Sequence, residues 1–140
     1  MKILYLPLLF ALFCQCATNE KTGIVYAGKF EILNKRATSE RWNALLLKNG
    51  FDKTLQTLKI RKARDPETEQ TFYYLFGETA DNSFKIATIL SREKNYFYLP
   101  KNPEYVTCNC LEGSPMRVGN RWICETQGEE ECEETIVAAK

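Results

Sequence analysis

Apolar and polar residues alternate over much of the chain, and this alternation predicts strands. Between residues 23 and 33 the apolar side chains fall on every second position, which is the spacing of a strand with one buried face. Gly28 interrupts this segment and predicts a bulge or a sharp bend. Near residue 60, Lys59 and Arg61 alternate with leucine and isoleucine, so a second strand is expected to carry one charged face.

A run of further strands is predicted in the middle of the chain. Residues 70–78 are apolar at both odd and even positions, which is typical of a central strand covered on both faces. The segments 84–90 and 96–99 follow after turns, and strands at about 10-residue spacing indicate an antiparallel meander. Aromatic residues in 72–76 and 96–98 would line a ligand pocket if the sheet curled into a barrel, but packing in a core is the favoured interpretation.

One helix is predicted, over residues 39–48. Ser39 is a suitable N-cap, and Asn49 with Gly50 supplies a left-handed stop at the other end. Trp42 lies on the same face as two leucines, so this face of the helix is expected to pack on the sheet.

The N-terminus has the pattern of an export signal. A short charged start and an apolar run of 11 residues predict a signal peptide over residues 1–16, because the run is too short to span a bilayer. Cys16 and Cys14 resemble the acylated cysteine of bacterial lipoproteins, and Cys16 is the preferred site. The resemblance implies a polar tether over residues 17–22 and a location in the cell envelope. The length of the chain leaves room for a single globular domain, expected over residues 23–140. Without acylation, the protein is expected to be secreted.

Four cysteines lie in the C-terminal segment 106–135, and an exported chain is expected to join them in two disulfides. A bridge between Cys108 and Cys110 would close a very small and strained ring. Cys108 therefore pairs with Cys124 and Cys110 with Cys132, or Cys108 pairs with Cys132 and Cys110 with Cys124. The sequence leaves both pairings open.

The residues between the cysteines predict a terminal hairpin. Residues 107–111 and 121–126 are short and strand-like, and turns are expected at 113–115 and 119–120. The expected fold is therefore α+β, with an antiparallel meander sheet of about six strands, one packed helix and a disulfide-stapled C-terminal hairpin.

The composition excludes several kinds of chemistry. The chain contains no histidine, which removes the histidine-dependent nucleophiles, histidine metal ligands and the usual near-neutral proton shuttle. The formal net charge of +1 argues against a general electrostatic grip on nucleic acid. Zinc bound by the four thiolates is less favoured than two disulfides, and calcium bound by residues 129–134 is less favoured than a solvated acidic tip. No metal and no cofactor are therefore expected.

The charges are distributed unevenly along the chain. Residues 59–64 include four lysines and arginines, whereas residues 125–134 include six glutamates. The favoured interpretation is two solvated surfaces that attract each other within the fold. The alternative is that one of them docks a charged partner.

The expected function is non-enzymatic, because no catalytic signature is present. We expect an exported domain, tethered to the membrane by a lipid, that binds an envelope protein or a surface ligand or stabilises an envelope assembly. Its recognition surface is expected in the loop 112–120 or on the strand face of Lys59 and Arg61. The candidate binding residues of the loop are Glu112, Ser114, Met116, Arg117 and Asn120. A carrier of small ligands with an aromatic-lined cavity and, less favoured, a hydrolase that uses carboxylates without histidine are the alternatives.

Overall fold

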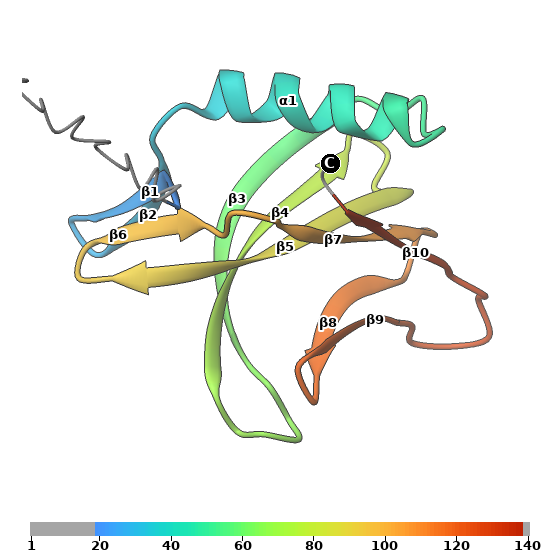
Figure 1. Ribbon diagram of the computed structural model, residues 1–140. Coiled ribbons are helices and arrows are strands. Elements are labelled where there is room, and N and C mark those ends of the chain that lie inside the picture. Colours follow the sequence, from blue (N-terminus) through green and yellow to red (C-terminus); the bar gives the residue numbers. More distant parts are fainter. Residues whose placement is uncertain (1–18, 139–140) are drawn as a thin grey trace, which may run out of the picture.

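The structure is a computed structural model that describes residues 19–138 (Figure 1). Within this range the chain forms one helix and ten strands. The elements are β1 (Glu20–Tyr26), β2 (Lys29–Ile32), α1 (Lys35–Lys48), β3 (Leu55–Arg64), β4 (Thr71–Thr79), β5 (Phe84–Glu93), β6 (Tyr96–Leu99), β7 (Glu104–Asn109), β8 (Ser114–Val118), β9 (Arg121–Glu125) and β10 (Glu133–Ala138). Among these residues, no helix has both the length and the apolar character needed to cross a membrane.

Eight of the strands form one antiparallel sheet that is nearly closed like a barrel. Strands β3, β4, β5 and β6 pair in sequence order, which confirms the predicted meander. The sheet divides at β5, because residues 84–88 pair with β7 whereas residues 91–93 pair with β6. Strands β1 and β2 continue the sheet beyond β6, and β10 continues it beyond β7. The strands outnumber the six or so expected, since the first predicted strand and the C-terminal segment each form several.

The meander is buried on both faces, and each face has its own core. Leu75 of β4 faces the first core, which includes Trp42 and Leu46 of α1. Phe76 faces the second core, on which Trp122 of β9 packs. Figure 1 shows α1 along one side of the sheet and the β8–β9 hairpin on the other side. Each fully buried side chain of this size contributes about 1.5–3 kcal/mol. The predicted central strand with two covered faces is therefore confirmed.

The helix begins four residues earlier than predicted. Helix α1 spans Lys35–Lys48, and its N-cap is Asn34 rather than Ser39. The Asn34 Oδ1 accepts a hydrogen bond from the Ala37 N–H at 3.1 Å, which satisfies one of the free donors of the first turn. The predicted end is confirmed, because Asn49 forms the C-cap.

The first predicted strand is a hairpin. Strands β1 and β2 pair through a turn that contains Ala27 and Gly28, whose φ angles are 50° and 74°. Two successive residues with positive φ are typical of the tight hairpin turn whose twist matches that of the strands. Gly28 therefore reverses the chain instead of bending one strand. Strand β1 begins at Glu20 and pairs with β6, so residues 20–22, expected in the polar tether, belong to the sheet.

The C-terminal hairpin is built from other strands than predicted. Strand β8 pairs with β9 around a turn at residues 119–120, and residues 113–115 lead into β8 rather than forming a turn. Residues 107–111 instead lie in β7 and directly after it, and β7 pairs with β5 and β10. The physical reason is burial on both faces, because Tyr105 packs in the first core and Val106 in the second. A strand buried in this way belongs in the main sheet.

Candidate functional site

Two disulfides hold the β8–β9 hairpin and the segment before β10 against the main sheet. Cys108 of β7 is bonded to Cys124 of β9 with an S–S distance of 2.04 Å, and Cys110 is bonded to Cys132 with an S–S distance of 2.06 Å. Two bridges are therefore confirmed, and the pairing is one of the two that the sequence left open. The bridges close loops with sequence separations of 16 and 22, and loops of this length contribute about 3 kcal/mol per bridge in the chain-entropy estimate.

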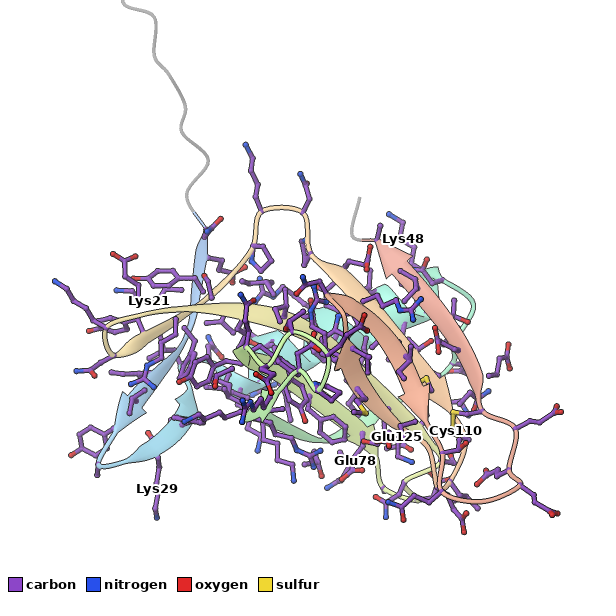
Figure 2. All side chains as sticks on the ribbon, turned by 90° about the horizontal axis from the view of Figure 1, so that it is seen from below. Lys21, Lys29, Lys48, Glu78, Cys110 and Glu125 are labelled. Carbon is purple, nitrogen blue, oxygen red and sulfur yellow. A yellow bond between two sulfur atoms is a disulfide. The ribbon has the colours of Figure 1, made fainter. Side chains whose placement is uncertain are left out.

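The two bridges lie side by side. The sulfur atoms of Cys108, Cys124 and Cys132 are within 4.8 Å of one another, and Figure 2 shows the sulfur atoms near the labelled Cys110. Each of these sulfurs is part of a disulfide, so none of them offers a thiolate to a metal ion. Gly113 packs directly on the second bridge, and a Cβ at this position would overlap the sulfur atoms of Cys110 and Cys132. The chain therefore requires a glycine where it passes the bridge.

Asp65 locks the tip of the hairpin to the β3–β4 turn. Its carboxylate accepts hydrogen bonds from the backbone N–H groups of Glu67 and Thr68 in its own turn, at 2.9 and 3.1 Å. It also accepts hydrogen bonds from the N–H groups of Gly119 and Asn120 in the β8–β9 turn, at 3.0 and 3.1 Å. Asp65 is only 2% exposed. One buried carboxylate thus joins its own turn to a second turn, whose residues Gly119 and Asn120 lie 54 and 55 positions after Asp65 in the chain.

The same four hydrogen bonds keep Asp65 ionised. Burial raises the pKa of a carboxyl group, but here the four backbone N–H groups outweigh burial and hold the pKa of Asp65 well below its usual value. Because the folded-state pKa is lowered, the carboxylate stabilises the fold fully above the pKa of the unfolded chain, which is about 4. This stabilisation is lost as the pH falls from there towards the folded-state pKa.

A buried lysine and a glutamate hold the base of the hairpin. The Lys85 Nζ donates hydrogen bonds to the carbonyl oxygens of Cys110 and Leu111, at 2.9 and 2.6 Å. The Glu130 carboxylate accepts hydrogen bonds from the N–H groups of Leu111 and Glu112, at 2.9 and 3.0 Å. Burial lowers the pKa of Lys85, while the charges of nearby glutamates, Glu130 among them, act in the opposite direction. The chain after β7 is therefore fixed from both sides.

The acidic segment before and within β10 has a structural role in addition to its charge. The Glu134 carboxylate accepts a hydrogen bond from the Cys124 N–H at 2.9 Å, and Glu130 holds the base of the hairpin as described above. The expected acidic tip is thus only partly solvated, because two of its glutamates bind backbone groups.

The face of the hairpin that points away from the sheet is apolar at its centre. It consists of three cross-strand pairs: Met116 with Ile123, Val118 with Arg121, and Ser114 with Glu125. We call this surface the outer hairpin face. Its three apolar side chains are half-buried and belong to neither core. Polar side chains therefore flank an apolar centre, which is the arrangement found in protein interfaces.

The structure separates the five predicted binding residues. Ser114 and Met116 lie on the outer hairpin face. Arg117 lies on the inner face, with its Cζ 5.4 Å from the ring centre of the buried tryptophan of β9. Glu112 lies at the base of the hairpin and Asn120 in its turn, and the backbone N–H of each is used to hold the fold. Ser114 and Met116 are therefore the two of the five residues that share the outer hairpin face.

The five candidate residues omit the other members of the outer hairpin face. Val118 lies within the predicted loop 112–120, whereas Arg121, Ile123 and Glu125 lie beyond it. Their signal is the alternation of residues on both sides of the Gly-Asn turn at residues 119–120. Centring the hairpin on that turn would have placed these side chains on one face.

The second predicted surface lies on a different part of the molecule. The Arg61 guanidinium is 3.8 Å from the ring centre of Phe76, and the Lys59 Nζ is 5.9 Å from the same ring centre. Both cations lie over the aromatic side chain of the neighbouring strand, as in cation–π contacts. Arg61 is half-buried by this contact, so part of the predicted charged face covers the second core.

A cleft lies between α1 and the connection from β6 to β7. Its volume is about 390 Å³. Its apolar walls are formed by Trp42, Leu45, Leu99, Pro100, Pro103 and Tyr105. Arg41 and Glu20 form an ion pair at 2.7 Å among the lining residues. Burial raises the pKa of the Tyr105 hydroxyl, which is therefore neutral at physiological pH. The cysteines predicted to be acylated, Cys14 and Cys16, lie outside the described residues.

Comparison with known proteins adds no function to this geometry. No protein-family model matches the chain, and neither a curated protein nor a solved structure matches it.

We predict that Asp65→Asn destabilises the protein, because the amide nitrogen would face an N–H donor in place of a carboxylate oxygen. The expected fall in Tm at neutral pH is about 5 °C. The wild type should lose stability more steeply than the variant as the pH falls below about 4. Thermal unfolding followed by circular dichroism at several pH values measures both effects. The control Asp52→Asn changes an exposed carboxylate and is expected to leave Tm unchanged. If the stability of Asp65→Asn and of the wild type had the same pH dependence, the stabilising role of the Asp65 carboxylate would be contradicted.

Proposed function

We propose that this protein is an exported, lipid-anchored and non-enzymatic binding module of the cell envelope, and that it recognises a partner protein with the outer hairpin face. The observation that carries the proposal is that the β8–β9 hairpin is fixed against the main sheet. Two disulfides and the Asp65 carboxylate fix a short element whose outer side chains contribute to neither core. A surface held in one conformation loses little conformational entropy on binding, so rigidity of this kind favours recognition.

The side chains of the outer hairpin face indicate what kind of partner surface would fit it. Met116 and Ile123 form the apolar centre, and a methionine adapts its shape to an irregular apolar surface. Arg121 lies towards the turn of the hairpin and Glu125 at its open end, so the face carries one charge of each sign. The partner is therefore a protein surface with an apolar depression, an acidic group near Arg121 and a basic group near Glu125.

The two carboxylates with lowered pKa values, Asp65 and Asp81, have structural roles. Asp65 is held by four backbone N–H groups. The hydroxyl groups of Thr79 and Ser83 lower the pKa of Asp81 to about 2. A general acid or base that works near neutral pH needs a pKa close to that pH, and lowered values have the opposite effect. Both carboxylates act instead as acceptors that hold turns.

We predict that Met116→Asp and Ile123→Asp each weaken partner binding by about tenfold or more, because either places a charge in the apolar centre. A photo-crosslinking residue at position 123 in the native host identifies the partner, and calorimetry with the purified partner measures the affinity. The fold and both disulfides should persist, since these side chains contact neither core.

The matched control for this experiment is Leu47→Asp, which changes an apolar residue of α1 that is 64% exposed. This control is expected to bind like the wild type. A partner that binds Ile123→Asp as tightly as the wild type would show that recognition uses another surface.

We also predict that the mature protein carries an acyl group at Cys16. Growth of the native host with a labelled fatty acid should label the wild type and Cys14→Ser, while Cys16→Ser should remain unlabelled and should leave the membrane fraction. Labelling that persists in Cys16→Ser but disappears in Cys14→Ser would move the anchor to Cys14. A wild type without label would remove the lipid anchor from the proposal.

The cleft beside α1 favours a second candidate function, the carriage of a small apolar ligand. Trp42 lines this cleft and Trp122 lies in the other core, so the variant Trp122→Phe leaves one reporter at the cleft. The aromatic residues that would line a cavity in this alternative are packed together, with the Phe97 ring centre 5.1 Å from Phe30 and 5.2 Å from Tyr73. We therefore predict that fatty acids leave the fluorescence of Trp122→Phe unchanged; saturable quenching would favour the carrier.

A further inference from the structure

Within residues 19–138 the main sheet has three terminal strands, β2, β3 and β10, and two of them, β3 and β10, carry opposite charge. Along the order β3, β4, β5, β7, β10, the first and last strands each pair with only one neighbour within residues 19–138. Strand β3 carries the basic residues Lys59, Arg61, Lys62 and Arg64. Strand β10 begins with Glu133 and Glu134 and follows Glu129, Glu130 and Glu131. We call β3 the basic edge, and β10 with these preceding glutamates the acidic edge.

The two edges do not neutralise each other within the chain. Three strands lie between them in the sheet. The ion pairs in the described part of the chain are Arg36 with Glu40, Arg41 with Glu20, and Arg64 with Glu69. None of these pairs joins the basic edge to the acidic edge. Among residues 19–138, therefore, no ion pair joins the two charged segments that were expected to attract each other.

Each edge also offers backbone groups for pairing. A strand with one neighbour directs alternate N–H and C=O groups away from that neighbour. Lys62 and Arg64 are exposed on the basic edge, and Glu133 and Ile136 are exposed on the acidic edge. Strand β2 approaches the first half of β3 near Lys59, where the two strands line a shared groove. The second half of β3 is therefore the part that can accept another strand.

We propose that the acidic edge of one copy pairs with the basic edge of a second copy, so that the sheet continues from one protein molecule to the next. Two basic edges or two acidic edges would place like charges opposite each other, which disfavours contact between identical edges. The unlike edges attract each other, and backbone hydrogen bonds complete the added strand pair. This association goes beyond the proposed function and does not use the outer hairpin face.

The charges also indicate the direction of the added strand. All strand pairs in residues 19–138 are antiparallel. In an antiparallel contact, Glu133 at the start of β10 lies near Arg64 at the end of β3 of the next copy. Lys62 then lies close to the same acidic group, and Ile136 reaches the middle of β3. A parallel contact in the same place would bring Arg64 to the apolar end of β10 instead.

The contact is head-to-tail, because it joins two different surfaces of the same chain. Each added copy leaves one free edge of each sign, so the copies form either a closed ring or an open row. Charged side chains on an edge strand oppose unspecific pairing. The same charges that prevent general aggregation therefore select one contact.

Sedimentation velocity of the purified full-length protein in detergent tests the proposal. At about 20 mM salt the sedimentation coefficient should rise with protein concentration, and at about 500 mM salt, where charges are screened within about 4 Å, it should stay near the monomer value. Lys62→Glu and Glu133→Lys should each weaken the association by about tenfold or more. The double variant exchanges these two charges and should associate more tightly than Glu133→Lys alone, because one attractive pair is regained while Arg64 is unchanged. The controls Lys101→Glu and Glu93→Lys change exposed residues on neither edge.

Two results would overturn this proposal. One is a wild type that remains monomeric at every concentration in low salt, and the other is association that neither Lys62→Glu nor Glu133→Lys weakens. Association through the outer hairpin face would be weakened by Ile123→Asp, which the edge contact does not involve. The failure of this proposal and the failure of the proposed function are therefore distinguishable.

Discussion

A strand with apolar side chains on both faces must be covered on both faces, and this constraint organises the whole chain. Strand β4 places Leu75 in one core and Phe76 in the other. A helix of 14 residues covers the first face. The second face is covered by a two-stranded hairpin, an element that is marginally stable by itself in water. It is therefore held by bonds other than its own packing, namely two disulfides and the carboxylate of Asp65.

The parts of the fold that depend on local pattern could be predicted from the sequence. The meander follows from the period of two and from turns between the strands, and the end of α1 follows from Asn49 and the glycine after it. The start of the helix could not be predicted, because Asn34 and Ser39 are both suitable N-caps. Tertiary packing selects between them: Thr38 is 4% exposed, so one side of the first turn packs against the rest of the protein.

The candidate site depends on contacts between distant parts of the chain, and this is why less of it could be predicted. An aspartate before a proline is ordinary turn chemistry, and nothing near Asp65 in the sequence indicates that its carboxylate also holds Gly119. The choice between the two disulfide pairings likewise depends on which strands Cys108 lies between. Alternation on either side of the 119–120 turn was the one local signal that could have defined the outer hairpin face.

The bridge between Cys108 and Cys124 also links the completion of the fold to the compartment in which it occurs. A newly made chain in a reducing environment lacks both disulfides. The β8–β9 hairpin that covers Phe72 and Tyr74 is then held only by the hydrogen bonds of Asp65 and the other hydrogen bonds at the hairpin. When that cover opens, an aromatic sheet face is exposed, which is the kind of surface that chaperones and aggregating chains bind. Formation of the two disulfides in an oxidising compartment fixes the hairpin over this face, so the aromatic side chains stay covered.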